Sequence, residues 1–520
     1  MGYWSTYLAK ILRKFSGSTA VSIGILGSRI VGFLRESLFA HYFGNSLAAD
    51  AFRAALRIPN LLQNLFGEGV LSASFIPVYA RLRSEGKDQE AKELSSAIFL
   101  LLTIVSSIIT VLGVVFTPLL IDLITPGFKG EVRELSIRLV RILFPGTALL
   151  VLSAWCLGVQ NSHKRFLLSY SAPIFWNLAI IAALLLYAQS ESGIVYVTWG
   201  VTLGCVLQLL VQLPTTLTLT SGISARLDFS GQPLKQVLRN FFPVVFSRGV
   251  VQISAFLDAV IASALPLGSL SALTYAQILY LLPVSLFGMS VSASELPELS
   301  ALKEDEKERY LERLEKGIHK VLFFVIPSAA AFIFIGDYLI GLVFQSGAFT
   351  SADTYRVWQA LLILSLGLPL SSVSRLFASF FYSRNQAGSL LKVSLARVFL
   401  SAALGALLSV VLGYGLNGLC VGTSLGALLE FILLIFLLKS SLGILPRLSK
   451  HILTVLVFAI LAGIFGRVIG GVISFEFQSV ILARFIRGLV PVVGFCLVFG
   501  TGLALSGFRG SLEQFFAKRA

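Results

Sequence analysis

Ionisable side chains gather in two apolar segments near the start of the chain, at residues 20–43 and 51–80. In and between these segments lie Arg29, Arg35, Glu36, Asp50, Arg53, Arg57 and Glu68. An ionisable group inside a membrane is costly unless it is paired or hydrated, so it is a functional candidate by default. A guanidinium group keeps its charge in a low-dielectric site and can hold a phosphate through two parallel hydrogen bonds. The pattern therefore favours an anion-binding wall in which the acids hold the arginines in place.

Helical geometry allows these side chains to share one wall. At about 100° per residue, Arg29 and Glu36 lie about 20° apart, and Arg35 lies about 120° away. The alternative is a set of internal ion pairs, such as Arg35–Asp50, that only fix helix packing. We favour the binding wall because the charges are concentrated in one helix pair. The related segments of the second half carry fewer charges, namely Arg248, Asp258, Glu295 and Glu298.

The elements that position these residues are predicted to be membrane-spanning helices. The chain has 520 residues, of which 56% are hydrophobic and 13% are charged, about half the charged share of a soluble protein. Many apolar runs reach the length of about 20 residues that crosses a bilayer. Lipid offers no partner to exposed backbone groups, and a barrel would show alternation, so helices are expected. We predict an all-α polytopic membrane protein with about 14 transmembrane helices, at residues 20–43, 51–80, 95–123, 135–160, 166–188, 193–218, 238–264, 269–298, 319–345, 355–382, 389–413, 415–438, 451–473 and 482–507.

Basic residues predict the orientation. With a cytoplasmic N-terminus, the inner loops and tails hold 26 of the 41 Lys and Arg residues, and the outer side holds 7. This bias places both termini of a multi-pass membrane protein in the cytoplasm. It also explains the net charge of +15 without nucleic acid. We see no secretory cleavage signal and expect the first apolar segment to be retained. The charged loop 303–320 is interpreted as a plain connector, with a surface amphipathic helix as the alternative.

An internal repeat divides the chain. SRIVGF at 28–33 corresponds to SRGVVQ at 247–252, and FGEGVLSASFIP at 66–77 corresponds to FGMSVSASELP at 287–297. Six predicted spans separate the copies, so both start on the same side of the membrane. This predicts two parallel six-helix repeats related by an axis along the membrane normal. The predicted parts are an N-terminal lobe at 1–225, a C-terminal lobe at 226–440 and two appended helices at 441–520.

Motifs of known catalytic or nucleotide-binding sites are absent from the sequence. It contains no GxxxxGK[ST], no HExxH and no CxxC, and its four cysteines all lie within apolar segments. We therefore expect a transporter rather than an enzyme, with no bound cofactor. The energy would come from an ion gradient, the membrane potential or substrate supply.

The stretch SRIVGFLRESLFAHYFGNSLAADAFRAALRIPNLLQNLFGEGVLSASFIPVYARL at 28–82 resembles the MurJ (MviN) family, as does LPLGSLSALTYAQILYLLPVSLFGMSVSASELPELS at 265–300. MurJ proteins are flippases of the MOP superfamily, proposed to carry lipid II, the undecaprenyl-diphosphate-linked precursor of peptidoglycan, for cell wall biogenesis and cell shape. The resemblance implies two lobes around a V-shaped cationic cavity that opens alternately to each side. It also implies that the two appended helices form a groove for the prenyl tail.

The resemblance also suggests site residues. Positions that match the family's are Ser28, Arg29, Arg35, Asp50 and Asn60, and Glu36 stands where an Asp is usual. Two departures are Gln63 and the pair Gln277–Ile278, where the family has charged residues. The candidates to compensate for the missing charges are Arg53, Arg57 and Arg248. A cation site of some members, which would bind sodium, points to Asp258 and Thr423, although the predicted span at 389–413 lacks the expected Asn and Asp.

The leading hypothesis is a lipid II flippase in which Arg29 and Arg35 contact the diphosphate. The departures at Gln63 and Ile278 keep a second hypothesis open, an exporter of another lipid-linked sugar or of amphiphilic drugs, as in MATE transporters. The abundance of arginine disfavours cationic drugs. A third hypothesis is a scaffold that recruits wall-synthesis enzymes, for which the loop 303–320 rather than the arginines would matter.

Overall fold

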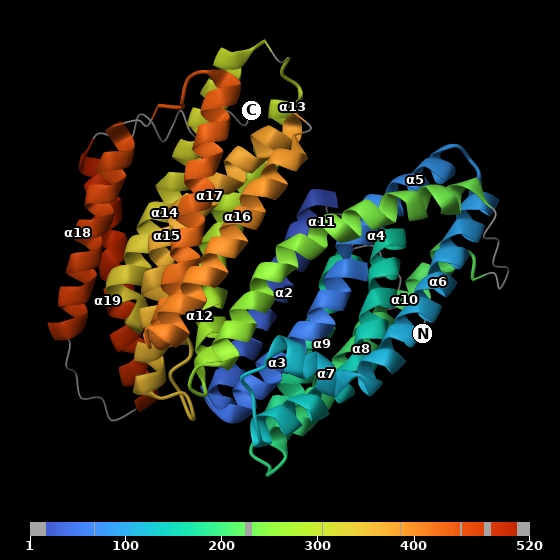
Figure 1. Ribbon diagram of the computed structural model, residues 1–520, viewed down its shortest axis with the longest axis horizontal. Helices are drawn as coiled ribbons and strands as arrows, with labels where there is room; N and C mark the ends of the chain where they lie inside the picture. Colours follow the sequence, from blue (N-terminus) through green and yellow to red (C-terminus); the bar gives the residue numbers. More distant parts are fainter. Residues whose placement is uncertain are drawn as a thin grey trace, which may run out of the picture. The chain divides into compact units, whose positions relative to one another are not determined.

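The computed structural model describes residues 17–66, 68–223, 231–303, 305–384, 386–447, 450–472 and 480–506. These residues form helices and loops and contain no strand. A helix coincides with each of the fourteen predicted spans (Figure 1). The prediction of an all-α polytopic protein is confirmed.

Contacts between the helices divide the chain into two compact units, Met1–Val260 and Ile261–Ala520. The first unit contains α2 (Gly17–Phe43), α3 (Leu47–Phe66), α4 (Glu68–Ser74), α5 (Ile76–Ser84), α6 (Asp88–Val115), α7 (Thr117–Ile124), α8 (Glu131–Ser162), α9 (Phe166–Tyr187), α10 (Gly193–Leu219) and most of α11 (Gln232–Ser263). The predicted lobe boundaries at 225 and 440 stay a prediction.

The second unit contains the remaining helices. They are α12 (Ser269–Pro283), the π-helical turn η1 (Val284–Met289), α13 (Ser290–Ser300), α14 (Lys307–Val343), α15 (Ser351–Ser383), α16 (Ala387–Ala406), the π-helical turn η2 (Leu407–Val411), α17 (Gly415–Leu442), α18 (Lys450–Val472) and α19 (Val480–Leu505).

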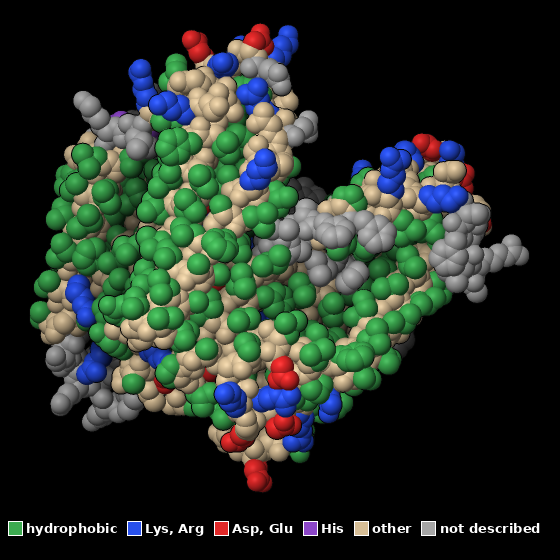
Figure 2. All heavy atoms as spheres, viewed as in Figure 1, with side chains coloured by type: hydrophobic (Ala, Val, Ile, Leu, Met, Phe, Trp, Pro, Cys, Tyr) green, Lys and Arg blue, Asp and Glu red, His purple; other side chains and the backbone are tan. Residues whose placement is uncertain are grey.

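Eleven helices in the described part of the chain are long and apolar enough to cross a membrane. The other three predicted spans coincide with α2, with the region from α3 to α5 and with α11. Hydrophobic side chains cover the flanks of the helices in Figure 2, and charged side chains gather mostly near helix ends. This distribution is the one expected of helices surrounded by lipid.

The first unit is organised around α8, which packs against α3, α6 and α10, while α9 packs between α2 and α10. Its apolar core includes the buried side chains of Phe75, Tyr79 and Trp155. Buried amides add polar links between α8 and α10: Gln212 donates to the Ser153 hydroxyl at 2.6 Å, and Gln160 donates to Thr216 Oγ1 at 3.0 Å. These bonds fix the register of two helices whose surfaces are otherwise apolar.

In the second unit, α18 and α19 pack against each other and against α14. Two glycines of α18 allow the close approach to α14. A Cβ atom at Gly463 would lie 2.4 Å from the ring of Phe334, and one at Gly470 would lie 2.6 Å from that of Tyr338. The helices predicted as an appendage therefore share an apolar core with α14.

The interpretation of the loop 303–320 as a plain connector is wrong for most of its length. Helix α14 begins at Lys307 and continues to Val343, so most of the charged segment is a helical extension of the span. The extension is bound to α13, since Arg313 donates to Glu298 at 2.6 Å and Lys320 donates to Glu295 at 3.2 Å. The alternative of a helix is confirmed from Lys307 onwards, and the two ion pairs connect this helix to α13.

The second repeated motif marks an irregular helix in both copies. In the first copy, α4 ends at Ser74 and α5 begins at Ile76. In the second copy, the π-helical turn Val284–Met289 separates α12 from α13. At Gly288 a Cβ atom would lie 3.3 Å from that of Ser372, so glycine there allows α15 to approach. Such interruptions in membrane helices are often found at functional positions.

Candidate functional site

An ion cluster of Arg35, Glu36 and Arg53 joins α2 to α3. Glu36 is buried, with 7% of its surface exposed. One carboxylate oxygen accepts a hydrogen bond from Arg35, and the other accepts from Arg53 Nη2 at 2.5 Å. One acid thus binds two guanidinium groups from neighbouring helices. We call these three residues the α2–α3 ion cluster.

Aromatic rings support both arginines of the cluster. The guanidinium carbon of Arg35 lies 4.8 Å from the ring centroid of Trp176 on α9, and that of Arg53 lies 4.6 Å from the centroid of Phe39. Each such contact is worth about 0.5–2 kcal/mol, more when water is excluded. The Arg35 side chain stays 18% exposed and that of Arg53 only 6%. Arg35 is therefore the member of the cluster that can reach an anion, and Arg53 is positioned to hold Glu36.

The other predicted residues of α2 and α3 surround this cluster in sequence and differ in burial. Arg29 and Asn60 are exposed, Ser28 is half-buried, and Asp50 is buried in the first turn of α3. An acid in a first helical turn is stabilised by the positive end of the helix dipole. The acid of the cluster is Glu36, which pairs with Arg35 and with Arg53, and a role of these residues in substrate binding stays a prediction.

Arg57 connects α3 to α11. It donates a hydrogen bond to the backbone carbonyl of Ala255, and the carboxylate of Asp258 attracts its guanidinium group. Arg57 is therefore already engaged within the first unit. Arg248 belongs to the same helix α11, but its side chain lies outside the described residues.

The predicted sodium ligands lie in different units. Asp258 is on α11 and acts on Arg57, whereas the Thr423 hydroxyl donates to the Leu419 carbonyl of its own helix α17 at 3.1 Å. Within the described ranges, no group of three or more His, Cys, Asp or Glu side chains could hold a metal ion. The sodium site stays a prediction.

Two ion pairs in apolar helices were missed from the sequence. Arg397 on α16 donates to Glu430 on α17 at 2.6 Å, and Arg467 on α18 donates to Asp337 on α14. Each charge lies inside or near the end of a predicted span, which was a usable signal. These charges are isolated, unlike the clustered charges of the first two spans.

Close contact between α2 and α9 places Arg35 against Trp176. A Cβ atom at Gly24 would lie 2.8 Å from Tyr170 Cβ and 3.0 Å from the Tyr170 carbonyl carbon. Real Cβ atoms do not approach backbone and Cβ atoms so closely, so Gly24 is required by packing. The glycine keeps α9, and with it the ring of Trp176, near α2.

We expect Gly24→Ala to lower the melting temperature of the purified protein by several degrees. Overpacking typically costs about 1–3 kcal/mol, and the atoms that the new methyl meets belong to the start of a side chain and to backbone. Thermal unfolding in detergent measures the effect. Gly500→Ala on α19 is the control, because nothing lies within 4 Å of its Cβ position. Equal melting temperatures for the two variants would show that α2 and α9 do not need this contact.

The family model described as "Lipid II flippase MurJ" matches residues 39–490, most of the chain. The chain belongs to the MurJ family. The family is one of flippases, in agreement with the expectation of a transporter rather than an enzyme.

MurJ relatives match over most of their length. A relative from Rhizobium tropici is 34% identical over 411 residues, covering 77% of this chain and 76% of its own. "Lipid II flippase MurJ" from Burkholderia cenocepacia is 30% identical over 431 residues, covering 81% and 83%. A solved structure, "Lipid II flippase MurJ, inward closed conformation", has a TM-score of 0.77 at 25% identity, covering 95% of this chain and 99% of that one.

A multidrug MATE transporter of the MOP superfamily, solved in an inward-facing conformation, has a TM-score of 0.64 at 17% identity. The match covers 79% of this chain and 94% of the transporter. At this identity the likeness concerns the fold alone.

Proposed function

We propose that this protein translocates lipid II, the undecaprenyl-diphosphate-linked peptidoglycan precursor, across the bacterial cytoplasmic membrane by alternating access. Family membership supports the substrate. The observation that carries the chemistry is the guanidinium group of Arg35, partly exposed yet held by Glu36 and by the ring of Trp176. A preorganised cation in an apolar helix pair suits a diphosphate.

In this proposal the diphosphate contacts Arg35 and the exposed Arg29, while Glu36 and Arg53 hold Arg35 in place. Because Glu36 already orients the guanidinium group of Arg35, binding of the diphosphate costs little conformational entropy of this side chain. The prenyl tail stays in lipid. Helix α18 presents exposed apolar side chains suited to it, among them Leu453, Leu461 and Val468.

We further propose the orientation that the basic residues predict, with both termini in the cytoplasm, and an association with wall-synthesis enzymes. Translocation would be coupled to the membrane potential or to an ion gradient. Since Asp258 is attracted to Arg57 and Thr423 bonds its own helix, we derive no sodium-dependent step.

Arg35→Ala is expected to abolish complementation in a strain that lacks its own flippase, because the exposed cation of the cluster is lost. The same cells should show at least a tenfold drop, on the order of 1.4 kcal/mol or more in binding, in precursor exposed on the outer face. Membrane insertion is checked by immunoblot. Arg165→Ala is the control, since Arg165 is an exposed arginine before α9 in the same unit.

Full complementation by Arg35→Ala would remove the proposed role of this residue. Resistance to cationic compounds, combined with unchanged precursor exposure, would instead favour the drug exporter. The guanidinium groups of the α2–α3 ion cluster argue against that alternative because they repel cations.

A further inference from the structure

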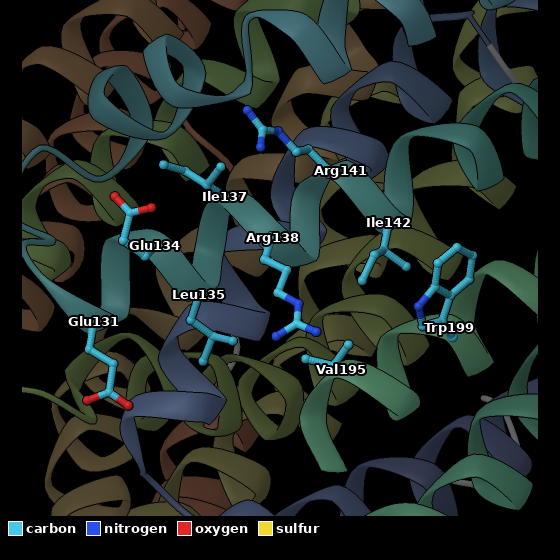
Figure 3. A pocket seen from close by; sticks show the side chains of 9 residues that line it. All are labelled: Glu131, Glu134, Leu135, Ile137, Arg138, Arg141, Ile142, Val195 and Trp199. Carbon is cyan, nitrogen blue, oxygen red and sulfur yellow. The ribbon is translucent and has the colours of Figure 1, made fainter. Parts of the chain in front are cut away.

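A second charged site lies far along the chain from the α2–α3 ion cluster. A groove of about 680 Å³ opens between the N-terminal ends of α8 and α10 (Figure 3). Its volume lies within the range of roughly 300–1,000 Å³ of small-molecule sites. It is lined by Glu131, Glu134, Leu135, Ile137, Arg138, Arg141, Ile142, Val195 and Trp199.

Two exposed arginines in this groove are not neutralised by the protein. Arg138 and Arg141 lie three residues apart on α8, and neither has a hydrogen bond or ion pair within the described part of the chain. The neighbouring Arg133 differs, since it bonds Asp122 through two nitrogens at 2.6 and 2.9 Å and Glu134 at 2.9 Å. Uncompensated guanidinium groups at the edge of an apolar span favour an anionic ligand group.

The charges follow a fixed order along the helix. The acids Glu131 and Glu134 come first, and the arginines follow deeper in the apolar span. At a rise of 1.5 Å per residue, Arg138 lies about 6 Å below Glu134 and about 10 Å below Glu131. In a glycerophospholipid that carries an amine, the phosphate likewise lies nearer the acyl chains and the ammonium nearer the water. The order of charges in the groove complements that headgroup.

Aromatic and aliphatic side chains on α10 match the rest of such a lipid. Trp199 in the groove is 54% exposed, and Tyr196, one turn before it, is 47% exposed. Exposed Trp and Tyr are typical of the membrane–water interface. Leu203 and Leu210 follow along the same helix and are exposed, as expected where acyl chains pack.

We propose that this groove binds a glycerophospholipid with a primary amine in its headgroup, distinct from the transported substrate. The phosphate would bind Arg138 and Arg141, and the ammonium would bind Glu131. Assignment to the outer leaflet rests on the proposed orientation, but binding itself does not. A bound lipid would hold the outer ends of α8 and α10 together.

The test is native mass spectrometry of the full-length protein from nanodiscs that contain phosphatidylethanolamine, phosphatidylglycerol or phosphatidylcholine. We expect retained phosphatidylethanolamine, and roughly tenfold less retention for Arg138→Gln/Arg141→Gln, because charge-assisted bonds to phosphate are lost. Glu131→Gln should keep lipid binding but lose the preference for phosphatidylethanolamine over phosphatidylglycerol. Lys129→Gln, which removes an exposed charge just before α8, is the control and should retain lipid like the unmodified protein.

Equal retention by the double Gln variant, or displacement of the lipid by free glycerol phosphate, would overturn the proposal. So would equal retention of all three lipids by the unmodified protein. If the double Gln variant does not insert, Arg138→Lys/Arg141→Lys serves instead and should show intermediate retention, since lysine keeps the charge without the bidentate geometry. Complementation of the flippase-deficient strain is scored separately, so failure here leaves the proposed function standing.

Discussion

Glu36→Ala is expected to abolish complementation and to lower the free energy of unfolding by about 3–5 kcal/mol, because removing one partner of a buried pair leaves uncompensated charge. Here the loss leaves two guanidinium groups, those of Arg35 and Arg53, facing each other across α2 and α3. The change should exceed that of any exposed pair in the first unit. Thermal unfolding in detergent and complementation in cells measure the two effects.

Matched variants separate charge from packing. Glu36→Asp keeps the acid and should retain part of the complementation, whereas Glu36→Gln keeps the shape and should lose it. Glu85→Ala is the surface control, because the Glu85–Lys87 pair at 2.8 Å is exposed and should contribute little. A Glu36→Ala protein that melts at the same temperature as Glu85→Ala would rule out a stabilising role for the cluster.

The second large effect is expected at the pair between α16 and α17. Arg397→Leu should lower the free energy of unfolding by about 3–5 kcal/mol, because the Glu430 carboxyl group would lose its partner in an apolar helix pair. The Glu430 side chain is only 16% exposed, so water can solvate its carboxyl group only in part. The melting temperature of the purified variant measures it.

The double variant Arg397→Leu/Glu430→Leu is expected to recover most of the lost stability, since buried ion pairs are often replaced by apolar side chains without loss. Complementation by this double variant then tells whether the pair serves only folding. A double variant as unstable as Arg397→Leu alone would show that the arginine acts through contacts other than Glu430, which a double-mutant cycle would quantify.

Apolar run length was enough to predict the helices, because the bilayer sets their minimum length. Even the span with most charges, around Arg53 and Arg57, is helical in the structure. The candidate site was predicted in part. The clustering of charges in the sequence indicated that arginines and an acid of α2 and α3 lie together, as Arg35, Glu36 and Arg53 do.

The partners within that site could not be predicted in the same way. Glu36 binds Arg53 across two helices, and Arg35 meets Trp176, which is 141 residues away in the sequence. Such contacts depend on how close two helices approach, which Gly24 permits through its lack of a side chain. Helical periodicity gives the direction of a side chain around its own axis and contains no information about the neighbouring helix.

The sharing of one carboxylate by two arginines has an electrostatic consequence for transport. With Glu36 ionised, Arg35, Glu36 and Arg53 together keep one positive charge when no substrate is present. An incoming diphosphate is therefore attracted to the cluster. Because the diphosphate carries two negative charges, its binding changes the net charge of the cluster from positive to negative. Loaded and empty forms of the helix pair then differ in charge. An applied voltage acts on such a difference with about 2.3 kcal/mol per elementary charge per 100 mV if the group crosses the whole field.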